Sequence, residues 1–194
     1  MSFYSGTQTE VLFSGPPANY TAAAASSSSA QSLVAGATGN YQQPLLPGGF
    51  WQQGRQGQLV SFEFSILLSC QSSATTTTII AGLDTAANTI GGSTLLTYPA
   101  LTTTSYSSGS LYGAGIIQNR GSGYGTSSVA TNLLSSGWLI GTGNSATVSG
   151  AAGPTALQTI DFSVNQWFYL TVTFSTSSAS NSATLESLIV RGEN

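Results

Sequence analysis

Side chains that could act as acids, bases or nucleophiles are scarce in this sequence. Among 194 residues there are six acidic side chains, three basic ones, all arginine, and no histidine. A serine triad needs a histidine base, a zinc site needs several His or Cys ligands, and a Schiff base needs lysine. The composition therefore excludes all three kinds of site. The single cysteine, Cys70, has no histidine to activate it, so we expect an inert, partly buried thiol.

The carboxylates are therefore the remaining candidates for catalytic groups. Glycosidases use a pair of acids, and Asp84 and Asp161 are the only aspartates. Each stands beside turn residues, so we expect ordinary turn roles, in which Asp bonds to nearby backbone. Glu63 is expected to be solvated or at an interface, or to pair with Arg55 or Arg120. Because the acids do not cluster in the sequence, no calcium cage is expected.

Two further patterns each have a structural and a functional interpretation. Residues 120–125, RGSGYG, resemble a phosphate-binding glycine loop. No helix is expected after them and the chain has no lysine, so they predict a turn. Trp51, Trp138 and Trp167 could form a platform for stacking sugars, although core and interface packing is the commoner use of such residues. We predict no catalytic, cofactor-binding or metal-binding residues, and a protein that is not an enzyme.

Short strands would position all of these residues. Apolar and polar residues alternate strictly from Val60 to Leu68, the mark of a strand with one buried face. Strand patterns also occupy residues 75–83, 156–162, 168–174 and 183–191. Further candidates cover residues 94–101 and 105–117, which are weaker, and 127–134 and 138–140, with a loop expected at 141–154. No amphipathic helix is evident, so the pattern predicts an all-β protein, an antiparallel β-sandwich or jelly roll.

The first part of the chain has a different character. Residues 1–49 contain prolines, an AAAASSSSA run and one short strand candidate at 10–13, and prolines and glycines at 44–49 separate them from the strand that follows. We predict an extended N-terminal arm over residues 1–49 and a β-sandwich domain over residues 50–194. Aromatic side chains at the arm's density usually pack against something. The predicted assembly interface consists of Phe3, Tyr4, Leu12, Phe13, Tyr20 and Tyr41.

The composition limits the possible partners. Charged residues make up 5% of the chain and the net charge is −3, whereas about a quarter of an ordinary protein is charged. So few basic groups argue against nucleic-acid binding. No stretch reaches the roughly 18 apolar residues that a membrane span needs, and the first residues lack a secretion-signal pattern. Because the charge is low, copies of the protein repel one another only weakly over long distances, which suits a protein that packs against other protein molecules.

Several motifs, taken in chain order, resemble one family of proteins. They are YSGT at 4–7, PANYT at 17–21, PLLPGGFWQQGR at 44–55, AGLDT at 81–85, RGSGYG at 120–125, DFSVNQW at 161–167 and STSSASNS at 175–182. Their order is similar to that in small virion proteins of tailed bacteriophages, notably those of actinobacterial hosts, and the resemblance covers nearly the whole chain. One departure is the glycine-rich region at 111–118, where related chains usually carry an aromatic-led strand and a Cys.

The resemblance implies a role as well as a fold. Such proteins resemble single jelly-roll or immunoglobulin-like domains that often form trimers, and members serve as capsid decoration (cement) proteins. It therefore implies a homotrimer that is assembled in the host cytoplasm, binds the major capsid protein on the outer capsid surface and stabilises the shell. The arm would clamp a neighbour by pairing with its edge strand. The alternative is a receptor-binding or carbohydrate-binding β-sandwich module on a tail or fibre.

Overall fold

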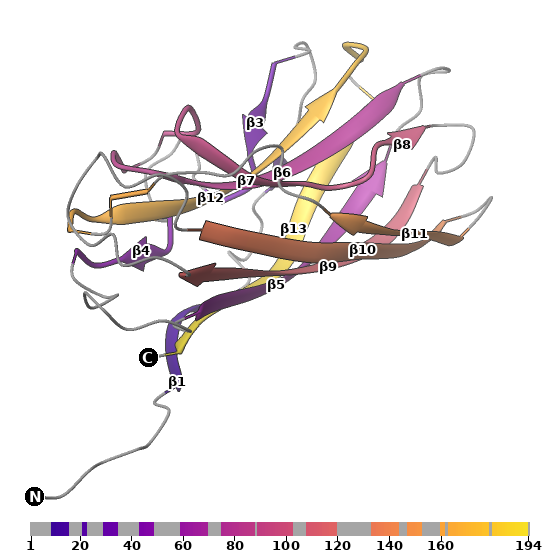
Figure 1. Ribbon diagram of the computed structural model, residues 1–194. Helices are drawn as coiled ribbons and strands as arrows, with labels where there is room; N and C mark the ends of the chain where they lie inside the picture. The colour runs from indigo at the N-terminus through magenta and orange to yellow at the C-terminus, as the bar shows by residue number, and fades with distance from the viewer. Residues whose placement is uncertain are drawn as a thin grey trace, which may run out of the picture.

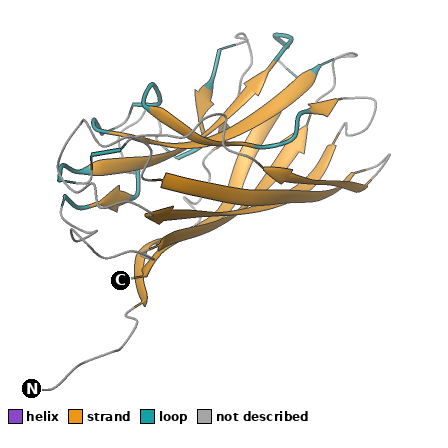
Figure 2. Cartoon of the chain, viewed as in Figure 1, coloured by secondary structure: helices purple, strands orange, loops and turns teal. Residues whose placement is uncertain are grey.

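The computed structural model describes thirteen stretches of the chain. They are residues 9–15, 21–22, 29–34, 43–48, 59–69, 75–87, 89–102, 108–119, 133–143, 147–152, 160–161, 163–178 and 180–193. Within these stretches the chain forms strands, turns and irregular segments, and no helix (Figure 2). The all-β prediction is confirmed. In the same stretches, no helix is long and apolar enough to cross a membrane.

The strands form two sheets, and all their pairings are antiparallel. The first sheet runs in the order β1-β13-β5-β9-β10-β11, with β2 also on β13. Its strands are β1 (Thr9–Gly15), β2 (Thr21–Ala22), β5 (Leu59–Ser69), β9 (Ser108–Asn119), β10 (Leu133–Gly143), β11 (Thr147–Ala152) and β13 (Ser182–Glu193).

The second sheet runs in the order β3-β12-β6-β7, with β4 on β12 and β8 on β6. Its strands are β3 (Gln31–Ser32), β4 (Leu45–Leu46), β6 (Thr76–Asp84), β7 (Ser93–Thr97), β8 (Leu101–Thr102) and β12 (Gln166–Phe174). Figure 1 shows the two sheets as stacked layers. The predicted antiparallel sandwich is therefore confirmed.

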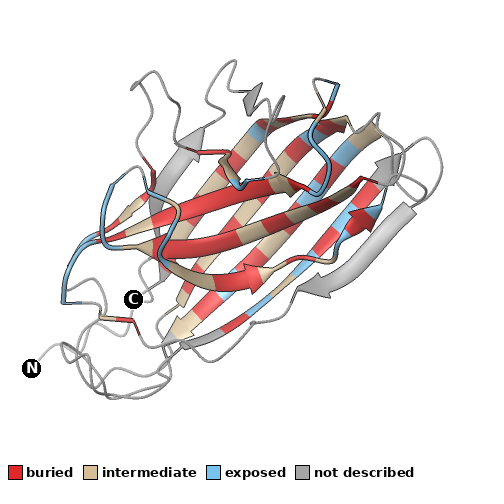
Figure 3. Ribbon diagram, turned by 90° about the horizontal axis from the view of Figure 1, so that it is seen from above, coloured by how far each residue is buried: buried red, intermediate tan, exposed pale blue. Residues whose placement is uncertain are grey.

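Alternating side chains from both sheets build the core between the layers. Buried and less buried residues alternate along β5, and bands of buried residues cross the central strands (Figure 3). The ring of Phe62 on β5 packs against that of Phe168 on β12, with 4.8 Å between their centroids. Phe64 meets Tyr98 edge-on at 5.3 Å. The alternation at 60–68 thus predicted the inward face of β5 correctly.

Glycines in β9 make room for these rings. Gly113 and Gly115 lie directly opposite Phe64 and Phe62 on the neighbouring strand β5. A Cβ atom on Gly113 would overlap the ring of Phe64, and one on Gly115 would overlap the ring of Phe62. Because a phenylalanine on β5 stands beside a glycine on β9 in both pairs, each ring has room over the neighbouring strand, and the core can keep a normal packing density. The glycine-rich region at 111–118 is therefore an ordinary central strand.

Two polar contacts tie the sheets together near β7. The Tyr98 hydroxyl donates to the Ala114 carbonyl oxygen on β9 at 3.1 Å. The buried Ser135 hydroxyl on β10 donates to the Leu95 carbonyl oxygen on β7 at 2.7 Å. Burial raises the pKa of Tyr98, so its hydroxyl keeps the proton that it donates. Both contacts satisfy polar groups that would otherwise be costly to bury.

Parts of the predicted arm pair within the two sheets. β1 and β2 lie against β13, and β3 and β4 lie against β12. The short strand expected at 10–13 is confirmed as part of β1. The division into an arm and a domain at residue 49 stays a prediction. Of the predicted interface, Leu12 and Phe13 belong to the backbone of β1, and the remaining residues lie outside the described stretches: Phe3, Tyr4, Tyr20 and Tyr41.

The longest strand that the sequence analysis missed is β11; the two-residue strands β2, β3 and β4 were not predicted either. The loop predicted at 141–154 is wrong, because β10 continues to Gly143 and β11 pairs with it in register over Thr147–Ala152. Small residues such as Gly, Ala and Ser have weak strand propensity, and pairing with a formed neighbour overrides it. Of the strand predicted at 156–162, residues 160–161 are not strand and the others lie outside the described stretches.

Candidate functional site

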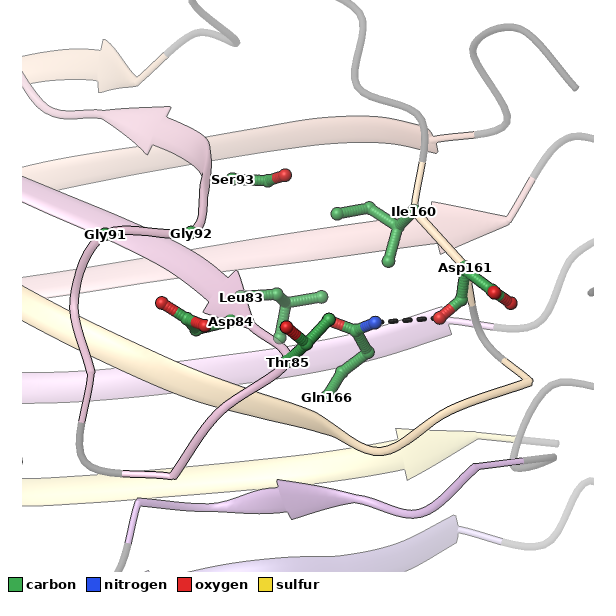
Figure 4. Close-up of a pocket in the computed structure, with 9 residues that line it drawn as sticks. All are labelled: Leu83, Asp84, Thr85, Gly91, Gly92, Ser93, Ile160, Asp161 and Gln166. Atoms are coloured by element: carbon green, nitrogen blue, oxygen red, sulfur yellow. Dashed lines mark hydrogen bonds between the residues drawn. The ribbon is translucent and has the colours of Figure 1, made fainter. Parts of the chain in front are cut away.

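The two aspartates line one pocket of about 440 Å³. The pocket lies where the end of β6, the start of β7 and the residues before β12 meet (Figure 4). Asp84 and Asp161 stand on opposite sides of it in this view, with Thr85 and Gln166 between them. The Gln166 side chain donates to the Asp161 carbonyl oxygen at 2.7 Å and fixes that wall. The fold thus brings together two carboxylates that are distant in sequence.

Both aspartates are acceptors in local turns. Oδ1 of Asp84 accepts a hydrogen bond from the Ala86 amide at 3.0 Å. Oδ1 of Asp161 accepts two from Ser163, one from its amide at 2.8 Å and one from its hydroxyl at 2.6 Å. The turn roles predicted for Asp84 and Asp161 are confirmed.

The same bonds decide the charge state of the pocket. Burial raises the pKa of Asp84, but hydrogen bonds led by the Ala86 amide outweigh it, so the pKa is lowered overall. The hydroxyl and amide of Ser163 lower the pKa of Asp161. Both groups are therefore ionised at neutral pH, whereas a general acid in glycoside cleavage needs a raised pKa. Within the described stretches, no three His, Cys, Asp or Glu side chains gather as metal ligands.

The lowered carboxyl pKa values predict that acid destabilises the fold. Asp84, Asp161 and Glu63 have lower pKa values folded than unfolded, so they stabilise the fold above the unfolded values of about 4. That contribution is lost as pH falls through the lowered folded values, because the unfolded chain takes up protons first. We expect the urea midpoint to fall between pH 5 and pH 3. Asp161→Asn keeps the turn acceptor but removes one of the three carboxyl groups, so the urea midpoint of this control variant should fall less with pH than that of the wild type. A wild-type midpoint that is the same at pH 5 and pH 3 would contradict the prediction.

A second group of polar and aromatic side chains crosses the outer face of the first sheet. Arg191 on β13 donates through Nη1 to Oε1 of Glu63 on β5 at 2.9 Å. The Tyr112 hydroxyl on β9 donates to the other oxygen, Oε2, at 2.8 Å. The ring of Tyr112 in turn contacts that of Trp138 on β10, with 5.3 Å between centroids. These four residues, which we call the outer-face network, span four adjacent strands.

The outer-face network holds a charged carboxylate beside exposed aromatic rings. The hydrogen bonds from Tyr112 and then Arg191 lower the pKa of Glu63, and the bond to Glu63 raises the pKa of Tyr112. Glu63 is thus an ionised acceptor and Tyr112 a neutral donor at neutral pH. Trp138 is 45% exposed and Tyr112 38% exposed. Aromatic rings this exposed, grouped on one face, are typical of an interaction site.

The predicted site residues are only partly brought together. Trp138 belongs to the first sheet and Trp167 to the second, so these two cannot share one platform. Several sequence candidates lie outside the described stretches: Trp51, Arg55, Cys70, Arg120 and the rest of the turn predicted at 120–125. The partner of Glu63 is Arg191, which sequence reasoning did not offer. Strand alternation indicates that Glu63 points outward, but only the pairing order places β13 beside β5.

Comparison with known proteins adds no family to this geometry. No protein-family model matches the sequence, and no curated protein matches it.

Proposed function

We propose that this chain is a structural protein of a bacteriophage virion, a decoration protein that binds the major capsid protein on the outer surface and stabilises the shell. The motif order along nearly the whole sequence supports this role, as does the low charge. A β-sandwich with short turns is a compact module that can be added to an existing surface. In this proposal the protein attaches as a homotrimer, because several weak contacts at one symmetric site multiply into a stable attachment.

The strand order also supports a jelly-roll connectivity. β5 pairs with β13 while β6 pairs with β12, so the successive strands β5 and β6 lie against the successive strands β12 and β13. Wrapping one long antiparallel hairpin around a core produces such nested pairs in different sheets. Jelly rolls consist of eight strands with this two-sheet arrangement.

The observation that carries the assembly role is the position of β1. Within the described part of the chain, β1 is the outermost strand of the first sheet and pairs on one side with β13. An edge strand offers backbone groups to which a neighbouring chain can add a strand. The register also shifts between Val11 and Phe13, which leaves Leu12 as an extra residue at a bulge. Bulges are frequent at sheet edges, and Leu12 belongs to the predicted interface.

The copy number per virion tests this proposal. Quantitative mass spectrometry of purified particles should give a number comparable with that of the major capsid protein. A small minority count would place the protein in the tail, and absence from the particle would overturn the virion role. Adding purified protein to undecorated capsids then tests the edge: Leu12→Asp should weaken attachment, whereas Gln31→Ala, outside β1, should not.

A tail or fibre module that recognises carbohydrate is the second proposal. The exposure of Trp138 favours it, because an aromatic ring on an open sheet face is a feature that shell attachment through β1 does not use. Its low copy number would distinguish it from decoration of the shell.

A further inference from the structure

A groove of about 300 Å³ lies beside the outer-face network. Glu63, Ala114 and Trp138 lie directly opposite one another on β5, β9 and β10. Ala114 is the small residue in the middle of this row, so the space above it stays open between the carboxylate and the indole. The next row, Ser61, Ile116 and Ser136, lines the groove further along the strands. The groove therefore has one aromatic wall, one charged wall and hydroxyls nearby.

The two walls have complementary chemistry. Trp138 offers an exposed ring face, which carries negative π density and attracts weakly positive C–H groups. Glu63 is ionised and each of its oxygens already accepts one hydrogen bond, which leaves acceptor capacity on both. Arg191 uses one Nη1–H on Glu63 and keeps further donors in its planar guanidinium. Arg191 does not line the groove itself, but it lies directly opposite Ser61, which does. The ion pair thus places charged donors and acceptors beside an aromatic ring.

We propose that this groove binds a neutral saccharide, with a sugar ring stacked on Trp138 and its hydroxyls bonded to Glu63 and Arg191. A pyranose has C–H groups on a ring face and hydroxyls around its rim, which matches the two walls. Hydrogen bonds to charged groups are the strong ones, so the ion pair would fix the orientation of the sugar. This inference does not depend on shell attachment; it deepens the second proposal, on whose carbohydrate recognition it rests, by naming the groove and the class of sugar.

Other occupants fit the groove less well. A phosphate-bearing ligand such as nucleic acid would meet the negative charge of Glu63 with a single arginine beside it. A second protein surface would have to desolvate the Glu63–Arg191 pair, whose side chains are 39% and 33% exposed, at a cost that the pair's attraction does not reliably offset. Glu63 is the one carboxylate among the described lining residues. Hydrolysis of a glycoside uses two carboxyl groups, so the site is suited to binding and not to cleavage.

The test uses the purified full-length protein on an array of neutral oligosaccharides built from glucose, galactose, mannose and N-acetylglucosamine. We expect the protein to bind at least one class of these oligosaccharides. Isothermal titration calorimetry with that oligosaccharide then measures its affinity for the wild type and the variants. Trp138→Ala should abolish detectable binding, and Glu63→Gln should weaken it about tenfold, the effect of losing one charge-assisted hydrogen bond. Leu67→Ala, an equally exposed apolar residue on the same sheet that does not line the groove, should bind like the wild type.

A second variant separates loss of binding from loss of folding. Ala114→Leu fills the groove without changing either wall, and it should also abolish binding while the urea midpoint stays near that of the wild type. Failure of the wild-type protein to bind any oligosaccharide on the array would overturn the proposal, as would unchanged binding by Trp138→Ala. Self-association of the wild type that Trp138→Ala relieves, without sugar binding, would assign the face to a second copy instead. None of these outcomes changes the copy number per virion, so the decoration role is tested independently.

Discussion

Replacing Phe64 with alanine is expected to lower the free energy of unfolding by about 3–5 kcal/mol. The side chain is fully buried and its ring lies edge-on to Tyr98 at 5.3 Å. On the opposite strand it meets Gly113, which offers no side chain to fill the space that the ring would leave. The cavity cost therefore adds to the lost transfer free energy. Urea denaturation of the wild type and the variant measures the difference in free energy of unfolding, provided that the two proteins have the same m-value.

The glycine opposite Phe64 provides a sharper form of this experiment. Gly113→Val alone should destabilise by about 1–3 kcal/mol, because its Cβ would overlap the phenyl ring. In the double variant with Phe64→Ala, valine enters the vacated space, so the double variant should be more stable than the sum of the two single effects predicts. Gly113→Val combined with Phe168→Ala, whose ring packs against Phe62, is the matched control and should be additive. Additivity in both pairs would contradict the interlocked packing of β5 and β9.

The glycines show where sequence reasoning succeeds and where it stops. Alternation within one strand is a local property, so the inward face of β5 was readable from residues 60–68. The same period in β9 is hidden, because Gly113 and Gly115 face the core yet carry no apolar side chain. Glycine is needed at these two positions because Phe64 and Phe62 lie opposite them. The register between β5 and β9 joins distant parts of the chain, so it is a long-range property. A glycine-rich strand therefore looks like a departure from a pattern until its partner is known.

The outer-face network also depends on long-range strand pairing that the sequence does not reveal. Its four residues come from four strands, and Glu63 and Arg191 are far apart in the chain. The sequence identified Trp138 and Glu63 as separate candidates, one for stacking and one for an ion pair. The pairing of β9 with both β5 and β10 is what places Tyr112 between them. By contrast, the turn roles of Asp84 and Asp161 depend on residues two positions away, and these were predicted correctly.

Replacing Leu33 with alanine should cost about 2–5 kcal/mol, even though this residue precedes the clearest strand of the domain. Leu33 is fully buried in the core, and its amide donates to the Leu170 carbonyl oxygen on β12 at 2.8 Å. The prediction therefore asks whether the segment before residue 49 contributes to the cooperative unfolding of the sandwich. Thermal and urea unfolding should both show a single transition at lower stability.

Gln31→Ala is the matched control for this segment. Gln31 is two positions away on β3, is only partly buried, and its amide contacts the nearby carbonyl oxygens of Ser29 and Ala30 at 3.4 Å and 3.3 Å. It should therefore stay within about 0.5 kcal/mol of the wild type, as surface substitutions usually do. If Leu33→Ala also stays within that range, the segment is an appendage that docks without stabilising the core, and its apolar residues are then free to serve attachment to a neighbour. If Leu33→Ala is as costly as expected, attachment has to rely on parts of residues 1–49 other than Leu33, and β1 at the sheet edge is the first of these to test.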